Sequence, residues 1–448
     1  MTSASRAARR GFSAFGHRNY RLFYGGQVIS LVGTWMQQVA QAWLVLQISG
    51  GEPIWLGIVA AAQFVPVMIL GLFAGILADS LPKRQTLIVV QATMMVLAAI
   101  LAMLSAAGVV EIWMVLVLAV LLGCANALDM PVRQSFVVEM VGPRDVGNAV
   151  ALNSAMFNGA RVIGPAVAGI TIGLVGVTAA FAVNAVSFLA VIAGLAMMRD
   201  DELFRPHLVP RPRSVGEVRR SLGEGVGFVR RTPVVLMAVV VVGLVATFGM
   251  NFSVVIPPLA QDVLHGDAVA FGLLMAAGGL GAVMAAIGLA MSGRPRPIRI
   301  ALGAVVLGVA SVALAASTSI PVSLALMPLV GGGGIAMAAT ANATVQLAVP
   351  EGLRGRVMSV YTTVFSASMP LGGLLMGVLA SWAGIAEAIA IGGVLSLATG
   401  LLALAWWLRI RDRADGSVRR DPRDLASRQF PEAQPARLID GQPPAGVG

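Results

Sequence analysis

Residues 234–260 read VVLMAVVVVGLVATFGMNFSVVIPPLA and contain no charged side chain. An α-helix needs about 20 apolar residues to cross the hydrocarbon core of a bilayer, so this stretch is long enough to span a membrane. Similar apolar runs, separated by short polar breaks, follow one another along most of the chain. These runs are continuous and do not alternate every second residue, which argues against a β-barrel. The sequence therefore predicts an all-α integral membrane protein.

The composition of the 448-residue chain supports the same class. Hydrophobic residues make up 57% of the chain and charged residues only 12%, and the mean hydropathy is +0.85. Soluble domains carry about 25% charged residues, so a soluble globular enzyme is excluded. The single cysteine, Cys124, and the scattered histidines His17, His207 and His265 offer little for disulfide, metal or triad chemistry. We therefore expect no cofactor, no metal and no enzymatic activity.

Twelve membrane spans are predicted from the apolar runs. They lie near 20–48, 54–79, 85–107, 112–139, 147–175, 178–198, 233–262, 269–292, 298–317, 321–348, 355–383 and 386–409. The long interruption at 199–232 divides them into two sets of six. We expect two pseudo-symmetric six-helix bundles, residues 1–198 and 233–409, around a midplane cavity, as in many secondary transporters.

The interruption at 199–232 and the chain beyond 409 are polar. Within the interruption, Val215, Val218, Leu222, Val226 and Val229 recur at three- and four-residue steps. This period predicts an amphipathic helix on the membrane surface, although a solvated linker helix fits the pattern equally well. Residues 410–448 are charged, rich in proline and without periodicity, so we expect a disordered cytoplasmic tail.

The distribution of charge predicts the orientation in the membrane. With the amino terminus inside, the basic residues fall on the cytoplasmic side, except for Arg133 and Arg161, which lie within spans. The opposite loops carry the acidic residues Glu52, Glu111, Asp262, Asp267 and Glu387. This bias predicts a multi-pass protein of the cell (inner or plasma) membrane with both termini cytoplasmic. It also explains the net charge of +10, so no nucleic-acid partner is expected. Membrane lipid is expected to surround most of the chain.

Two motifs resemble those of the major facilitator superfamily. Residues 75–84 read GILADSLPKR and are similar to the family's cytoplasmic gate loop, which implies gating roles for Gly75, Asp79, Lys83 and Arg84. Ser80 and Pro82 depart from the family pattern, and we expect Glu139 to pair with Lys83 or Arg84.

The second motif, ARVIGPAVAG at residues 160–169, resembles the antiport motif of the superfamily's exporters. The matching positions are Ala160, Gly164, Pro165, Ala168 and Gly169, with alanine at 160 and 168 where the motif has glycine. A seam of small residues that only serves helix packing is the alternative interpretation.

Four further stretches accompany these motifs: NYRLF at 19–23, GTWMQ at 33–37, MPVRQ at 130–134 and ALNS at 151–154. Together they are similar to the transmembrane secretion effector branch, which includes exporters of enterobactin and macrolides. The resemblance implies efflux of a small amphipathic molecule, drug-like or siderophore-like, through alternating access and proton antiport. Many drug antiporters of the superfamily have an arginine early in span four that is linked to proton transfer. Residues 112–122 contain no arginine, so this proton route is not expected here.

The sequence also bears on the source of energy for transport and on the other functions that this fold could have. The chain has no G-x-x-x-x-G-K-[ST] motif for ATP, which also favours the proton gradient. A nutrient uptake permease of the same fold is the main alternative. An integral membrane transferase is a third possibility, but the clustered ligands that it needs are missing. We expect a monomer.

Three charged residues lie within the predicted spans, where ionisable groups are costly and need a partner or a function. Asp129 and Arg133 are four residues apart on one helix face, and Arg161 is expected at a similar depth on the neighbouring antiparallel span. The hypothesis is a cluster of all three that exchanges a proton during transport. A fixed packing network is the alternative, because two arginines would stabilise the ionised carboxylate.

Polar residues at helical spacing predict the wall of the substrate cavity. Uncharged hydrogen-bonding groups suit an amphipathic or aromatic ligand. The candidates are Gln27, Ser30, Thr34, Gln37, Gln38 and Gln41 on the first span, Gln63 on the second, Asn251 on the seventh, and Asn342 and Gln346 on the tenth.

Overall fold

The computed structural model describes residues 12–204, 215–293 and 295–420, with side chains throughout except at 72–80, 215–222 and 410–420. The chain divides into two compact units, Met1–Leu404 and Ala405–Gly448. Every regular element in the described ranges is helical, so the predicted all-α class is confirmed.

The helices follow the predicted apolar runs closely. The first group contains α2 (Arg18–Ile48), α3 (Pro53–Ser80), α4 (Lys83–Ala106), α5 (Ile112–Val175) and α6 (Val177–Ala196), with the short η1 (Ser13–Gly16) before it and η2 (Asp200–Glu202) after it. The amphipathic segment forms α7 (Val215–Arg231). The second group contains α8 (Pro233–Gly249), α9 (Phe252–Pro258), η3 (Leu259–Val263), α10 (Ala268–Met291), α11 (Ile298–Ala315), α12 (Ile320–Ala348), α13 (Glu351–Ala383) and α14 (Ile385–Arg420).

Ten helical segments among the described residues are long and apolar enough to cross a membrane. One of them, α5, has 64 residues and contains both of the predicted spans 112–139 and 147–175, separated by a non-helical backbone at Gly142. The helix α2 is not among the ten, because polar side chains such as Gln27, Gln37 and Gln41 lower its hydropathy, yet all three are buried. The number of twelve spans and the division into two bundles at 199–232 remain predictions.

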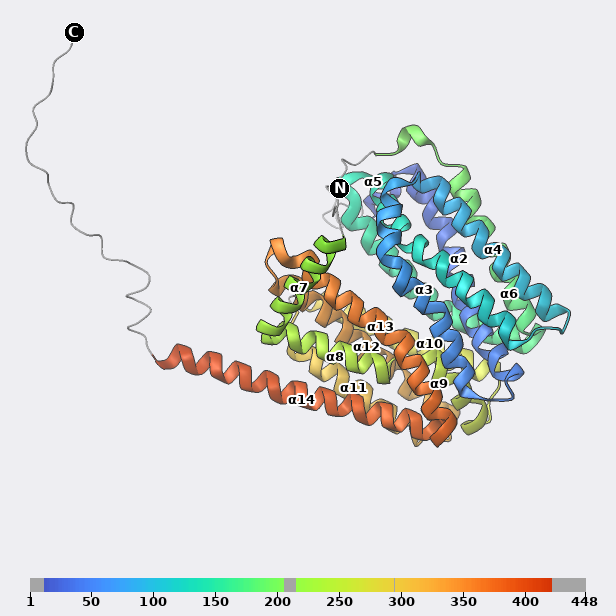
Figure 1. Ribbon diagram of the computed structural model, residues 1–448. Helices are drawn as coiled ribbons and strands as arrows, with labels where there is room; N and C mark the ends of the chain where they lie inside the picture. Colours follow the sequence, from blue (N-terminus) through green and yellow to red (C-terminus); the bar gives the residue numbers. More distant parts are fainter. Residues whose placement is uncertain (1–11, 205–214, 294, 421–448) are drawn as a thin grey trace, which may run out of the picture. The chain divides into compact units, whose positions relative to one another are not determined.

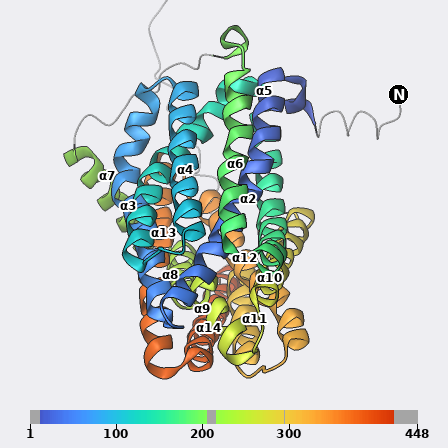
Figure 2. The ribbon, with the colours of Figure 1, turned by 90° about the vertical axis from the view of Figure 1, so that its right-hand side faces the viewer.

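The first group packs around α5 and α6. The helix α2 lies beside α6, and α6 also contacts α4 (Figure 2). The two parts of α5 have different neighbours. Gly123, in the first part, lies against the backbone of Gln63 on α3, and Gly164, in the second part, lies against Trp35 on α2. Glycine permits these approaches because a Cβ atom there would meet the neighbouring helix.

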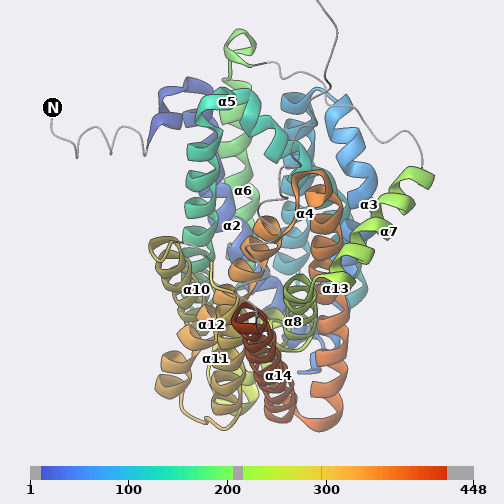
Figure 3. The same cartoon turned by 90° about the vertical axis from the view of Figure 1, so that its left-hand side faces the viewer.

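In the second group, α12 lies between α10 and α11, and it contacts both (Figure 3). The helix α7 packs against α13 and α8 (Figure 1). Gly225 of α7 lies close to the backbone of Arg356, whose side chain pairs with Glu224. The amphipathic helix therefore exists and docks on α13, while its place relative to a membrane remains a prediction.

The two groups contact each other through α3 with α13 and α5 with α10. The amide of Ile54, at the start of α3, donates to Ser381 Oγ near the end of α13 at 3.0 Å. Trp43 near the end of α2 stacks on Phe271 near the start of α10, with ring centroids 6.0 Å apart. Under the predicted orientation these contacts lie at the outer end of the helices.

The helix α14 continues to Arg420, past the boundary of 409 where the sequence predicts a disordered tail. The disordered tail remains a prediction. Residues 421–448 lie outside the described residues.

Candidate functional site: a polar cavity among α2–α6

The candidate site is a cavity of about 230 Å³ whose wall is formed by α2, α3, α4, α5 and α6. The lining residues are Gln27, Ser30, Leu31, Thr34, Gln37, Gln38, Gln41, Gln63, Phe64, Val67, Gln91, Met94, Leu122, Asn126, Asp129, Met130, Arg133, Asn184 and Phe188. Most of these side chains are polar although they belong to apolar helices. The cavity lies within the first group of helices, and not between the two groups as predicted.

The predicted stripe on α2 lines this cavity. All six of its candidates, Gln27 to Gln41, and Gln63 on α3 belong to the wall. The positions follow helical spacing, so one face of α2 turns toward α3, α4 and α6. Asn184 on α6 donates from Nδ2 to Gln37 Oε1 at 2.5 Å, which ties the stripe to the neighbouring helix α6.

The buried acid on α5 is held from two sides. Asp129 Oδ2 lies 3.0 Å from Arg133 Nη2, four residues later on the same helix. Asp129 Oδ1 accepts a hydrogen bond of 2.8 Å from Gln91 Nε2 on α4. The Asp129 side chain is 4% exposed and that of Arg133 is 23% exposed. Both residues line the cavity, so the predicted polar stripe and the predicted ion pair meet in one place.

Arg161 does not join this pair, and the predicted cluster of three is wrong in this respect. Its guanidinium lies over the ring of Trp35 on α2, 5.8 Å from the centroid, and its backbone packs against Gly279 on α10. The prediction assumed that consecutive antiparallel spans are neighbours. Instead, Asp129 in the first part of α5 bonds to Gln91 on α4, while Gly164 and Gly169 in the second part lie against α2 and α10.

Two buried acceptor atoms in the cavity wall have no hydrogen-bond partner among the described residues. They are Oε1 of Gln27 and Oε1 of Gln91, and both side chains belong to residues that are 3% exposed. The orientation of the Gln91 amide is fixed by Asp129, because an ionised carboxylate only accepts hydrogen bonds. An unpaired buried acceptor is unfavourable, so a donor from water or a ligand would satisfy it.

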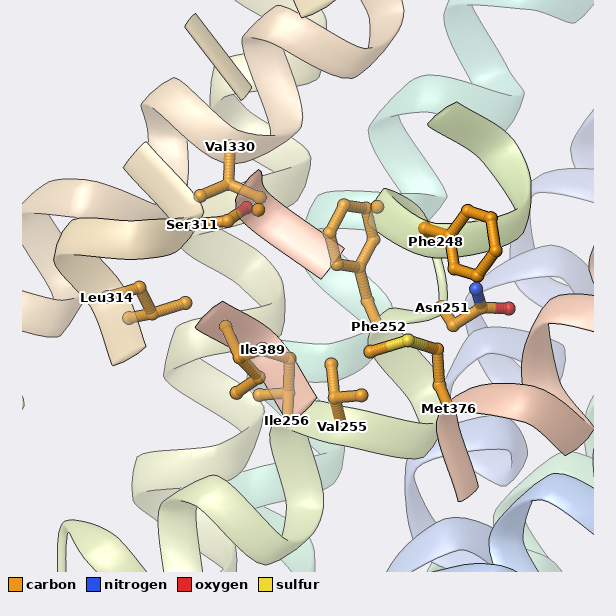
Figure 4. Close-up of a pocket in the computed structure, with 12 residues that line it drawn as sticks. Phe248, Asn251, Phe252, Val255, Ile256, Ser311, Leu314, Val330, Met376 and Ile389 are labelled. Atoms are coloured by element: carbon orange, nitrogen blue, oxygen red, sulfur yellow. The ribbon is translucent and has the colours of Figure 1, made fainter. Parts of the chain in front are cut away.

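The three predicted cavity residues of the second group lie elsewhere. Asn251 lines a separate, mostly apolar cavity of about 20 Å³, beside Phe248 and Phe252 (Figure 4). Its Nδ2 donates to the carbonyl of Thr247 at 2.7 Å, where the backbone between α8 and α9 is irregular. Gln346 donates to Asn342 Oδ1 at 2.6 Å on an exposed part of α12. Spacing on one helix does not reveal which partner helix that face meets.

Within the gate motif, the structure describes the side chains of Lys83 and Arg84. Lys83 forms an ion pair with Glu139. Arg84 instead donates to the carbonyls of Leu195 and Ala196 at the end of α6, each at 2.8 Å, where a cation is favourable. Gly75 and Asp79 lie in α3, and their side chains are outside the described part.

The antiporter-like motif forms a packing seam. Gly164 approaches Trp35 on α2, while Pro165 and Gly169 lie against Gly272 on α10. Ala160 and Ala168 are buried beside them. This arrangement fits the packing interpretation, and the role in antiport stays a prediction.

An anchor for the amino-terminal segment was not predicted. Asp145, just after the break at Gly142, accepts from Ser13 Oγ at 2.6 Å and lies 3.0 Å from His17 Nε2. The hydrogen bonds from Ser13 and His17 hold the pKa of Asp145 below its usual value of 3.8. The polar cavity residues that the sequence analysis missed are Gln91, Asn126 and Asn184. An isolated amide within an apolar run is the signal that marks Gln91.

Comparisons with known proteins agree on one family. The family model described as transmembrane secretion effector matches residues 9–433. The multidrug efflux pump Tap of Mycolicibacterium fortuitum is 30% identical, over 78% of this chain and 85% of the pump. The staphyloferrin A transporter of Staphylococcus aureus is 23% identical, over 84% of this chain and 92% of that transporter.

Solved structures show the same fold. A bacterial homologue of the lysosomal transporter Spinster, in an inward-facing and unoccupied conformation, matches with a TM-score of 0.66 and 13% identity, over 87% of this chain and 96% of that one. A POT family transporter in complex with 5-aminolevulinic acid matches with a TM-score of 0.70 and 11% identity, over 88% of this chain and 97% of that one.

Proposed function

Because the chain belongs to the transmembrane secretion effector family of major facilitator transporters, we propose that it exports a small amphipathic molecule in exchange for protons. The observation that carries this proposal is the cavity among α2–α6, where a wall of amide side chains surrounds one buried acid–base pair. Hydrogen-bonding groups in an otherwise apolar pocket are suited to orient a small ligand. A buried carboxylate within a membrane span is suited to take up and release a proton.

The contacts between the two groups of helices support an alternating-access cycle. Ile54 and Ser381 meet at the predicted outer end, and so do the rings of Trp43 and Phe271. Release to the outside requires these contacts to separate. With the outer end closed by these contacts, the structure corresponds to one state of such a cycle. Export is the direction we propose from the similarity to an efflux pump.

The proton step is assigned to Asp129. Its carboxylate is ionised when it pairs with Arg133 and accepts from Gln91. Protonation removes the negative charge and weakens the attraction to Arg133, so the cavity wall becomes positive and its hydrogen bonds change. The substrate then binds better to one charge state of the cavity wall and the proton stabilises the other. This difference in affinity is what exchange of substrate for protons requires.

Everted membrane vesicles with the cytoplasmic face outward test the proposal. Vesicles from expressing and non-expressing cells are energised by respiration and offered a panel of labelled amphipathic compounds, including siderophores and macrolides. We expect at least one compound to accumulate only in the expressing vesicles, and a protonophore to abolish this. Accumulation only in right-side-out vesicles would indicate the uptake permease instead, and accumulation that survives the protonophore would contradict proton exchange.

A further inference from the structure

The cavity also indicates the class of its ligand, an inference that rests on the proposed function. We infer that the cavity takes an uncharged ligand rich in hydroxyl or amide groups, and that Arg133 excludes organic cations.

The cavity wall carries no net charge. Among the described residues that line the cavity, the acid is Asp129 and the base is Arg133, so the two charges cancel. Each oxygen of Asp129 already has one partner, Arg133 at Oδ2 and Gln91 at Oδ1. The Asp129 side chain is also only 4% exposed, so its carboxylate presents little surface to an ammonium group. A cation that entered would meet the Arg133 guanidinium, which is the more exposed member of the pair, without a free counter-charge.

The second step is the hydrogen-bonding capacity of the wall. Six glutamines and two asparagines line the cavity, and each amide can donate and accept. Two acceptor oxygens, on Gln27 and Gln91, are buried without a partner among the described residues. A ligand with hydroxyl or amide donors satisfies such oxygens and finds donors for its own acceptors. A lipophilic cation without N–H or O–H groups leaves them unpaired.

The third step concerns Arg133 as the residue that sets specificity. If its guanidinium is replaced by a neutral side chain, Oδ2 of Asp129 loses its counter-charge. The wall then carries a net negative charge and a free acceptor, which is the arrangement that attracts a cation. Organic anions are disfavoured in the wild type, because they compete with Asp129 for the same guanidinium.

The test compares three probes with the same nitroaryl group: 4-nitrophenyl-β-D-glucoside, (4-nitrobenzyl)trimethylammonium and 4-nitrobenzoate. The full chain is purified into lipid nanodiscs, which avoids sugar-headed detergents, and binding is measured by equilibrium dialysis with absorbance. We expect the wild type to bind the glucoside about tenfold more tightly than either ion. In Arg133→Gln we expect the cation to gain about tenfold, which brings its affinity level with that of the glucoside.

The exposed Arg230 at the end of α7 provides a matched control: Arg230→Gln should keep the wild-type order. Arg133→Met serves as a second variant if Arg133→Gln does not fold, as judged by circular dichroism.

The inference is overturned if the wild type binds the cation as tightly as the glucoside, or if a folded Arg133 variant keeps the wild-type order. These assays need no gradient. A protein that binds the glucoside but moves nothing in vesicles contradicts the exporter alone, and one that exports yet prefers the cation contradicts only this inference.

Discussion

At the scale of single residues, Asp129 shows how the packing environment determines what a charge does. Its position four residues before Arg133 predicts their ion pair from the sequence alone, because residues at this spacing share a helix face. The residue that joins Asp129 and Arg133 as the third member of the group could not be predicted. Gln91 lies on α4 and occupies the second carboxylate oxygen, whereas Arg161 stacks on Trp35. Helical period identifies the face of a helix, but only tertiary packing decides which helix that face meets.

The pKa of Asp145 is lowered by hydrogen bonds from Ser13 and His17. The native carboxylate gives up its charge less readily than in the unfolded chain, so its contribution to stability is full above pH 3.8 and is lost as the pH falls through the lowered pKa. We expect the amides of residues 13–17 to be protected from hydrogen exchange at neutral pH, relative to an unstructured peptide at the same pH, and to lose this protection under these acidic conditions. Asp145→Asn should make this exchange fast already at neutral pH. If the variant kept the protection of the wild type, the anchor would not depend on this carboxylate.

At the scale of elements, the long helix α5 depends on one glycine. Gly142 has φ of 69°, a left-handed conformation that other residues adopt at a cost. A Cβ atom there would also lie 3.1 Å from the ring of Phe204. This break lets one continuous stretch form two spans that pack against different neighbours. The charged turn between them predicts two spans here, but the sequence does not show which helices each span meets.

We therefore expect Gly142→Ala to lower the free energy of unfolding by about 1–2 kcal/mol, measured by thermal unfolding in detergent. Gly147→Ala is the matched control, because this glycine lies in a helical stretch of α5 with nothing within 4 Å of its added Cβ. The control should be neutral or slightly stabilising, since alanine favours helix over glycine. Equal losses for both variants would show that the break at Gly142 needs no special residue.

At the scale of the whole transporter, the cycle requires the contacts at the predicted outer end to open. The amide of Ile54 bonds to the side chain of Ser381 across the two groups of helices. Cysteines at both positions, in a background where Cys124 is replaced by alanine, should form a disulfide. We expect this cross-link to reduce transport to less than about a tenth, and a reducing agent to restore it. Full transport by the oxidised protein would mean that this end does not open.

In the proposed cycle, protons and substrate exchange through Asp129. The most direct measurement is the number of protons moved per substrate molecule in everted vesicles, using a compound that the vesicle screen identifies. Asp129→Asn keeps the shape of the side chain and removes its titration. We predict that the variant still folds and equilibrates substrate across the membrane, but moves no protons with it and no longer concentrates it. An unchanged ratio of protons to substrate in the folded variant would contradict this account.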